Sequence, residues 1–175
     1  MALMKFTRCI LLLSTALTVL ICMGSAMSGE RPKRASFAGV WSMMHCERGQ
    51  PEYECATFYL YLTQKDDRIC GEHFVATQGL SKLDEGDPGT VLGVVKGKST
   101  TFMIRSTRND AWYVAEGDMA GQQLIWRRVG MMIPGSNDEP PVIPAKAALL
   151  KNSTPKLLAR LKEIESMPCV WPDQN

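Results

Sequence analysis

The stretch FAGVW, residues 37–41, decides the fold that the sequence predicts. A glycine followed two residues later by a tryptophan opens the first of seven short apolar segments, which turn residues separate from one another. These segments are residues 40–46, 55–64, 68–76, 90–96, 100–106, 111–118 and 122–129. Short strands spaced in this way are typical of an antiparallel all-β domain.

The breaks between these segments carry turn residues. They include Lys65-Asp66-Asp67, Asp87-Pro88-Gly89, Gly97-Lys98, Arg108-Asn109-Asp110 and Ala120-Gly121. Proline presets φ and glycine accepts positive φ, so both favour turns. Tight connections between consecutive strands favour an up-and-down barrel over a sandwich, because closure removes the exposed edges of an open sheet. We therefore expect an all-β, antiparallel up-and-down barrel of seven or eight strands, the eighth supplied by a flanking segment.

Two sequence features resemble the calycin barrels, the group that includes lipocalins and avidins. Gly39-Val40-Trp41 opens the first strand, and LIWRRV, residues 124–129, forms the last predicted one. In those families the tryptophan plugs the closed end and an arginine from the last strand packs over it. The resemblance implies that Trp41 is the plug and that Arg127 or Arg128 covers it. A looser similarity to small secreted bacterial barrels, including protease and lysozyme inhibitors, implies an inhibitor function as an alternative.

The N-terminus predicts export. Lys5 and Arg8 precede an apolar run, residues 9–22, and Gly24-Ser25-Ala26 offers small residues for cleavage. This is the layout of a secretory signal peptide. A transmembrane anchor is the alternative, but the run is shorter than the roughly 20 apolar residues that a bilayer requires. We expect a secreted or periplasmic protein with no stable membrane anchor after cleavage.

Removing the signal leaves one domain without excess charge. Taking 26 residues from 175 leaves 149, the length of an ordinary domain. The loss of Lys5 and Arg8 from 20 Lys and Arg leaves as many cations as the 18 Asp and Glu. A neutral chain argues against nucleic acid as a partner, because phosphate contact requires a basic surface.

The sequence divides into five predicted parts. These are a signal peptide (1–26), a flexible N-terminal arm (27–36), a β-barrel domain (37–130), a proline-rich linker (131–146), and a C-terminal helix and tail (147–175). Ser153 or Thr154 can cap the helix, and Pro155 suits its first turn. One predicted face of this helix holds Leu157, Leu158, Leu161 and Ile164. That face contacts either a partner or membrane, or the barrel wall; we favour the wall, because a disulfide would hold the tail down.

The period-two alternation of strands assigns side chains to the two faces of the sheet. With Trp41 inward, the predicted interior also includes Met43, His45, Phe58, Leu60, Leu62, Ile69, Gly71, His73 and Val75. The predicted outer face includes Cys46, Cys55, Tyr59, Tyr61 and Cys70. A filled interior would indicate a protein partner, whereas a hollow interior would indicate a small apolar ligand.

Four cysteines follow the signal, and an even number in an exported chain indicates disulfides. Cys46 and Cys55 flank one loop and face the same way, so we expect them to pair, which leaves Cys70 for Cys169. The alternative is a zinc site of Cys46, Cys55, Cys70 and His73, but these spacings match no paired-ligand finger. We expect no metal and no cofactor.

The sequence offers weak candidates for catalysis. In CGEH, residues 70–73, Cys70 and His73 project to opposite faces of a strand and lie about 10 Å apart, too far for a nucleophile and its base. Asp84, Glu85 and Asp87 share one turn, where we expect them to face water, and they converge on no predicted pocket. We expect a protein that is not an enzyme, with a hydrolase as the least favoured alternative. His73 is either a ligand-orienting group inside the barrel or a core histidine.

The predicted topology gathers the longer loops, residues 47–54, 77–89 and 107–110, at one end. Loops on a rigid scaffold often carry binding residues. The predicted binding residues are Tyr53, His73, Lys82, Arg108, Asn109 and Trp112. We expect a non-catalytic exported binding protein that uses the mouth loops or the interior, with a small apolar ligand or a secreted or periplasmic protein as its partner. The alternative is an inhibitor or immunity-type protein that blocks a secreted or periplasmic enzyme.

Overall fold

The computed structural model describes residues 35–169 and Trp171. The predicted signal peptide and residues 27–34 of the predicted arm lie outside the described residues. Within the described part, no helix has the length and apolar character needed to cross a membrane.

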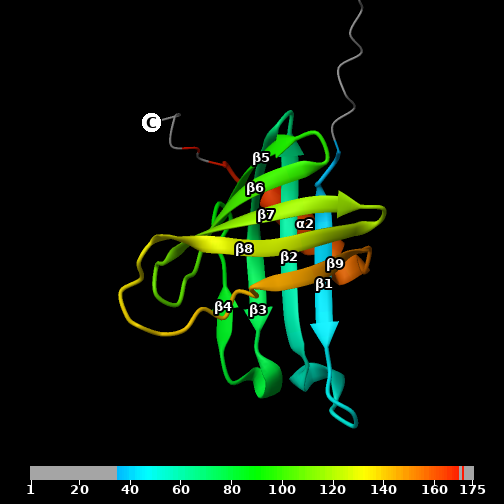
Figure 1. Ribbon diagram of the computed structural model, residues 1–175. Helices are drawn as coiled ribbons and strands as arrows, with labels where there is room; N and C mark the ends of the chain where they lie inside the picture. Colours follow the sequence, from blue (N-terminus) through cyan, green and yellow to red (C-terminus); the bar gives the residue numbers. More distant parts are fainter. Residues whose placement is uncertain (1–34, 170, 172–175) are drawn as a thin grey trace, which may run out of the picture. The chain divides into compact units, whose positions relative to one another are not determined.

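The described chain forms nine strands and one α-helix (Figure 1). The strands are β1 (Gly39–His45), β2 (Ala56–Lys65), β3 (Arg68–Ala76), β4 (Leu83–Glu85), β5 (Val91–Lys96), β6 (Ser99–Arg105), β7 (Trp112–Ala120), β8 (Gln123–Ile133) and β9 (Lys146–Asn152). The helix is α2 (Pro155–Glu165), and two short 3-10 turns are η2 (Glu52–Glu54) and η3 (Gln78–Leu80).

Eight strands close into an antiparallel barrel in the order β1-β2-β3-β5-β6-β7-β8-β9, with β9 pairing back onto β1. The ninth, β4, pairs with the end of β3 outside this ring. Strands β7, β8 and β9 run across the direction of β1, β2 and β3 (Figure 1). The predicted fold class, an antiparallel barrel with a short C-terminal helix outside it, is confirmed.

The eighth barrel strand is β9, which follows the proline-rich segment. It pairs with β8 through Gln123–Arg127 and with β1 through Val40–Ser42. The barrel therefore extends past residue 130, the boundary expected from the sequence. Its sequence, KAALLKN, does not alternate between apolar and polar residues, so it lacks the usual signature of a strand.

The barrel interior is filled by apolar side chains. Phe58, Leu60, Leu62, Phe102 and Ile104 are all fully buried in one cluster, which also contains both Trp41 and Trp126. The aromatic rings form a continuous series across this interior, with centroid distances of 5.3 Å for Phe58–Trp126, 5.4 Å for Phe102–Trp126 and 6.4 Å for Phe37–Phe102. Burying a side chain of this size contributes about 2–3 kcal/mol, so this cluster dominates the stability of the barrel.

FAGVW begins the first strand, as predicted. Trp41 is 1% exposed, and its Nε1 donates a hydrogen bond of 2.7 Å to the carbonyl oxygen of Phe37. The cation over the Trp41 ring is Lys151 of β9, with Nζ 5.6 Å from the ring centroid. Gly39, with φ of 129°, leaves room for this side chain, because a Cβ there would lie 2.8 Å from Lys151 Cε.

The predicted arginine cover of Trp41 is wrong. Arg127 forms an ion pair with Glu116, and Arg128 lies over the ring of Tyr113, 5.1 Å from its centroid. The resemblance assigned the cover to β8, whereas the strand that pairs directly with β1 is β9. Lys151 of β9 is the register partner of Trp41, and it occupies the position over the ring that the resemblance gave to an arginine.

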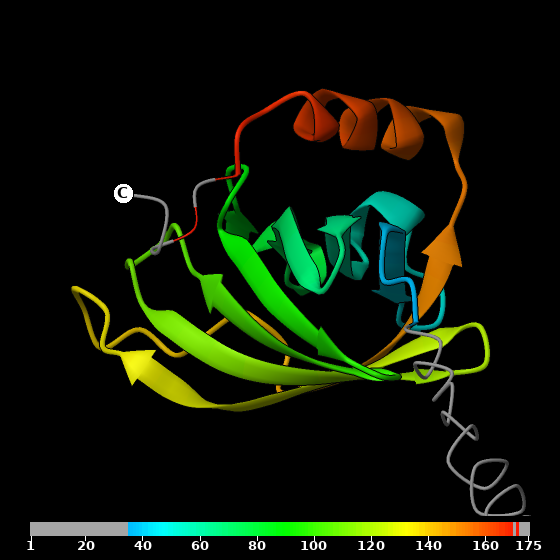
Figure 2. The same cartoon turned by 90° about the horizontal axis from the view of Figure 1, so that it is seen from above.

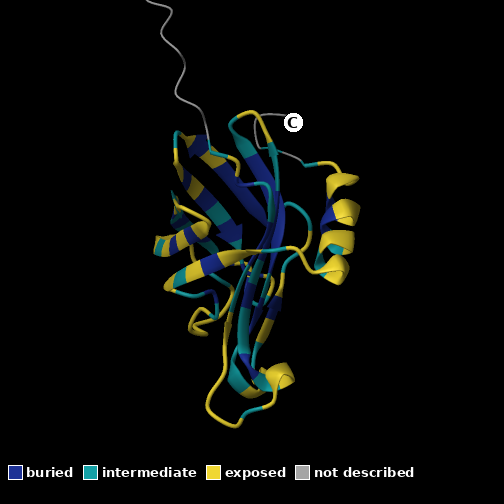
Figure 3. Cartoon of the chain, turned by 90° about the vertical axis from the view of Figure 1, so that its right-hand side faces the viewer, coloured by how far each residue is buried: buried dark blue, intermediate teal, exposed yellow. Residues whose placement is uncertain are grey.

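The outer wall of β1 and β2 is covered by α2 (Figure 2). Leu161 and Ile164 of the helix bury Val40 and Tyr61, and Leu157 packs at their side. The predicted packing on the barrel wall is confirmed, except that Leu158 is exposed. Figure 3 shows the exposed residues of α2 on the side away from the barrel.

Both predicted disulfides are present. Cys46 is bonded to Cys55, and Cys70 on the outer face of β3 is bonded to Cys169 beyond α2. The alternation therefore placed the cysteines on the correct face of the sheet. His45 follows the same alternation but is exposed, because it lies at the end of β1 beyond the filled interior.

Candidate functional site

The long connections gather at one end of the barrel. We call this end the rim, made up of residues 46–55, 77–90, 106–111 and 134–145. At the opposite end, the strands are joined by the short turns 66–67, 97–98 and 121–122. The three loops predicted at the mouth all belong to the rim, and the segment 134–145 joins them.

Neighbouring rim connections are bonded to one another. Gln78 donates a hydrogen bond to Gln50, which joins the first connection to the second. Arg108 in the third connection donates to the carbonyl oxygen of Leu83 in the second, at 3.0 Å, and to Glu139 in the fourth, at 2.6 Å. The rim is therefore a continuous surface rather than four independent loops.

The proline-rich segment 134–145 is anchored at both ends. The Ser136 N–H donates to the carbonyl oxygen of Asn109 at 2.7 Å, and the Trp126 indole donates to that of Pro144 at 2.9 Å. Ile143 is 1% exposed and belongs to the interior cluster. The sequence indicated an extended linker, but these contacts hold the segment against the barrel.

A glycine permits the close approach at the start of this segment. A Cβ on Gly135 would lie 2.6 Å from Asn109 Cγ, so any larger residue would displace the two connections. Asn109 is itself buried, and its Oδ1 accepts a hydrogen bond from the Ala111 N–H at 3.1 Å. Asn109 is thus a buried support for the rim.

A pocket of about 520 Å³ lies at this part of the rim. Strand β8 contributes Arg128, Val129, Gly130 and Met131, and the facing segment contributes residues 134, 135 and 137–141. Asn109 and Tyr113 complete the lining. The volume lies in the range of pockets that hold ligands.

The charges around this pocket are arranged about Glu139. The hydrogen bond and charge of Arg108 lower the pKa of Glu139, and the nearby charge of Lys82 adds to the effect. Among the described residues, Asp138 has no ion-pair partner. The pocket lining thus carries two carboxylates, Asp138 and Glu139, against the single guanidinium of Arg128.

A second apolar site lies on the outer wall at the rim. A groove of about 500 Å³ is lined by Met44, Tyr53, Tyr59, Phe74 and Leu80, among others. Tyr53 in η2 is 72% exposed, and η2 lies against η3. Exposed aromatic residues of this kind are enriched in protein interfaces.

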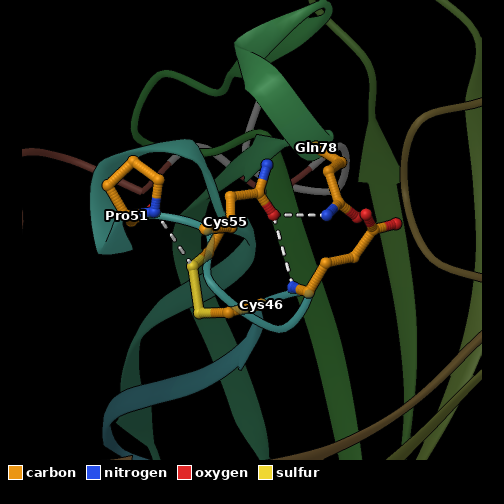
Figure 4. Close-up of a disulfide and its surroundings, with 6 residues drawn as sticks. Cys46, Pro51, Cys55 and Gln78 are labelled. Carbon is orange, nitrogen blue, oxygen red and sulfur yellow. Dashed lines mark hydrogen bonds between the residues drawn. A yellow bond between two sulfur atoms is a disulfide. The ribbon is translucent and has the colours of Figure 1, made fainter.

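The disulfide Cys46–Cys55 fixes the loop that carries Tyr53 (Figure 4). Cys55 Sγ lies 3.6 Å from the carbonyl oxygen of Pro51, and Gln50 Oε1 accepts from the Glu47 N–H at 3.3 Å. Together with the Gln78 contact, these interactions restrict the loop before any partner binds.

His73 lies inside the barrel, as the alternation predicted, and is 1% exposed. Its Nδ1 lies 3.3 Å from Thr90 Oγ1, and its Nε2 lies 3.3 Å from Asp84 Oδ1. Among the described residues Nε2 has no hydrogen-bond partner of ordinary geometry, so it approaches Asp84 closely without a regular hydrogen bond. These surroundings favour the interpretation of His73 as a core histidine.

Asp84 is the centre of this buried polar network. Ser106 Oγ donates to Oδ2 at 2.6 Å, and both the N–H and the hydroxyl of Thr107 donate to Oδ1 at 2.9 Å. Burial alone would raise the pKa of Asp84, but the contacts with His73, Ser106 and Thr107 outweigh it and lower the pKa. Ser106 is 4% exposed, and its hydroxyl belongs to this buried network through its hydrogen bond to Asp84.

The structure brings four of the six predicted binding residues to one side of the rim. Arg108 and Lys82 lie around Glu139, Asn109 lines the pocket, and Trp112 pairs with Ile133 of β8. The other two lie elsewhere, Tyr53 on the second groove and His73 in the interior. That these residues bind a partner stays a prediction.

Two surfaces that complete this site were not predicted from the sequence. The segment 134–141 was interpreted as linker because of its prolines, and the end of β8 was expected to stop at residue 129. The apolar run VGMMI, residues 129–133, was the signal that could have extended the strand.

No protein-family model, curated protein or solved structure in our comparisons matches this chain. The closed eight-stranded barrel is compatible with a calycin-like fold. At a coarse level, a disulfide-bonded β-barrel of this kind fits a non-catalytic binding protein.

Proposed function

We propose that this chain is an exported, non-catalytic binding protein whose rim recognises another protein. The observation that carries the proposal is the filled interior. A cavity would require five side chains to leave the interior, and all five are fully buried. They are Phe58, Leu60, Leu62, Phe102 and Ile104. Four pockets among the described residues lie at the rim or on the outer surface.

Two further features support a protein partner. Exposed apolar groups lie on the rim, as Tyr53 does, and beside it on β8, as Met131 does, and the rim also carries the charged cluster of Arg108, Lys82 and Glu139. An apolar centre with a polar surround is the usual composition of a protein interface. The two disulfides are bonds that persist in an oxidising compartment, which supports export.

A capture experiment tests the proposal. The purified protein is immobilised and exposed to the exported fraction of its own host, and the retained proteins are identified. A rim variant combines Tyr53→Ala, Lys82→Glu and Arg108→Glu. We expect it to retain at least about tenfold less of a specific partner, because truncating interface anchors commonly costs more than 1 kcal/mol each.

The matched control changes the same kinds of residues away from the rim. It combines Leu158→Ala on the outer face of α2 with Lys96→Glu and Lys98→Glu at the opposite end of the barrel. This variant should retain the partner as well as the original protein does. Equal retention by the rim variant and the control would contradict the proposal.

A second candidate function is inhibition of a secreted or periplasmic enzyme. The observation in its favour is that the rim is fixed in advance, by the Cys46–Cys55 disulfide and by the contacts of Arg108 and Asn109. Preorganised interfaces that move little on binding are characteristic of protease–inhibitor complexes. Inhibition of a panel of hydrolases from the same exported fraction, with the rim variant as control, tests this function.

A further inference from the structure

One edge of the barrel sheet is left without a partner strand. Strand β9 pairs with β8 only through Gln123–Arg127, and the last bond on that side runs from the Arg128 N–H to the Ala145 carbonyl oxygen, at 2.9 Å. Residues 129–133 continue as a strand, in which Gly130, Met131 and Ile133 pair with β7 on their other side and register shifts fall at Val129 and Met132. Among the described residues, no strand pairs with the side of residues 129–133 that faces away from β7.

This edge has register shifts at Val129 and Met132, which can protect an edge, but it lacks the other usual protection. Natural proteins commonly block a free edge with lysine or proline, or cover it with another segment. Residues 129–133 read VGMMI and contain neither, and Val129, Met131, Met132 and Ile133 are all exposed. Met131 is 57% exposed. Methionine side chains adapt to varied partners, so they suit a surface that binds.

The rim pocket lies beside this edge. Val129, Gly130 and Met131 form its β8 side, and residues 137–141 face them. The facing segment does not collapse onto the edge, because Arg108 holds Glu139 and Asn109 holds Ser136. The remaining space of about 520 Å³ can take side chains of an added strand.

The charge of this pocket indicates what the added strand carries. Glu139 is paired with Arg108, whereas Asp138 has no ion-pair partner among the described residues. Arg128, the cation in the lining, is stacked over the ring of Tyr113. A lysine or arginine on an incoming strand would therefore complement Asp138.

We propose that residues 129–133 of β8 bind an extended segment of the partner protein as an additional strand, with apolar side chains against Val129 and Met131 and a basic side chain facing Asp138. Backbone hydrogen bonds to a free edge would supply affinity, and the pocket would supply specificity. This inference rests on the proposed function, because it names how the rim holds its partner. A second copy of the chain, whose edge VGMMI carries no cation but directly follows Arg127 and Arg128, is the rival occupant, and the concentration dependence described below distinguishes it.

The test uses a defined probe, an acetylated eight-residue peptide in which valine alternates with threonine and one central threonine is replaced by lysine. A second peptide has glutamate at that position. Amide hydrogen exchange is followed by NMR in the protein purified after export. With saturating lysine peptide, exchange should slow by about tenfold or more at the amides of residues 129–133 that point away from β7, because new backbone bonds protect them.

Two pairs of variants make the test specific. Met131→Lys places a charge on the edge and should abolish peptide binding, whereas Met167→Lys, at an exposed methionine just after α2, should leave it unchanged. Asp138→Lys should reverse the preference between the two peptides, whereas Glu165→Lys at the exposed end of α2 should not. Unchanged melting temperatures will show that each variant is folded.

Three results would overturn the inference. The first is protection from exchange outside residues 129–133, and the second is a peptide preference that Asp138→Lys leaves unaltered. The third is protection of the edge that rises with protein concentration in the absence of peptide, because this would assign the edge to a second copy of the chain. Retention of a partner by Met131→Lys, with loss in the rim variant, would refute strand addition and leave the proposed function standing. Peptide binding at the edge without any partner at the rim would refute the proposed function instead.

Discussion

Asp84 connects two of the rim connections with strand β3 through one buried side chain. It lies in β4, a strand of only three residues, and accepts three hydrogen bonds from Ser106 and Thr107 while facing His73. Hydrogen bonds to a charged group contribute about 1.5–3 kcal/mol, more than neutral ones do. So short a strand keeps its position because of this side chain as much as through its pairing with β3.

The lowered pKa of Asp84 predicts a loss of stability in acid. Its folded pKa lies below the unfolded value of about 3.9, so its contribution is complete above that pH and is lost as the pH falls through the folded pKa. We expect Asp84→Asn to lower the free energy of unfolding by about 2 kcal/mol at pH 7 and to flatten its decline below pH 4. Urea unfolding across this range provides the measurement, with the exposed Asp87→Asn as control. Parallel curves for Asp84→Asn and the original protein would contradict it.

Tyr61 predicts a loss of stability in alkali. Burial under α2, followed by the effects of Tyr59 and Glu72, raises its pKa to about 12, although Arg160 opposes this. Because the folded pKa exceeds the unfolded value of about 10, the contribution is complete below pH 10 and is lost as the pH rises toward 12. Absorbance titration should show a late-ionising tyrosine that Tyr61→Phe removes. An unchanged titration in that variant would show that Tyr61 does not ionise late.

Helix α2 is held on the wall by an ion pair as well as by its apolar face. Arg160 donates two hydrogen bonds of 2.7 Å to Glu72, one to each carboxylate oxygen, and Glu72 is 4% exposed. These bonds raise the pKa of Arg160 further above its usual value. Since Glu72 is buried and Arg160 is partly exposed, the pair fixes the position of the helix more than it adds to total stability.

Removing Arg160 should therefore be costly. We expect Arg160→Ala to lower the free energy of unfolding by about 1–3 kcal/mol, because it leaves the charge of Glu72 without a partner. Glu163→Ala removes the other, exposed partner of Arg160 and should cost no more than about 0.5 kcal/mol. Chemical denaturation compares the two variants. Equal losses would mean that the buried pair does not hold the helix.

The strands that the sequence predicted well share a clear alternation. In FYLYL, residues 58–62, every second side chain lies in the interior, and the same pattern placed Cys70 outside for Cys169. Strand β9 was missed because Ala147, Ala148, Leu149 and Leu150 do not alternate. The position of segment 134–145 also could not be predicted from the sequence, because it depends on contacts with Asn109 and Trp126, which are distant from it along the chain.

The two disulfides close loops of very different length in the chain. Cys46 and Cys55 are 9 residues apart, and Cys70 and Cys169 are 99 apart. Closing a longer loop removes more entropy from the unfolded chain, with about 3 kcal/mol for 15 residues and about 4.7 kcal/mol for 100. The second bond therefore restrains the unfolded molecule as a whole.

Replacing each cysteine pair should reveal this difference. We expect Cys70→Ala with Cys169→Ala to lower the free energy of unfolding by about 2 kcal/mol more than Cys46→Ala with Cys55→Ala does. Urea unfolding of the two double variants under oxidising conditions measures the difference. A larger loss from the short loop would indicate that native contacts, rather than chain entropy, dominate the effect.

The pairing of β9 with β1 joins Val40 to Asn152, so the barrel closes only when both are available. A chain made from its N-terminus has seven of the eight barrel strands ready before the closing one emerges. Until then β1 and β8 both present bare edges, which can pair with another molecule. A product cut short near residue 145 would retain those edges permanently, and aggregation, rather than a merely weakened barrel, is the defect that such a truncation should produce.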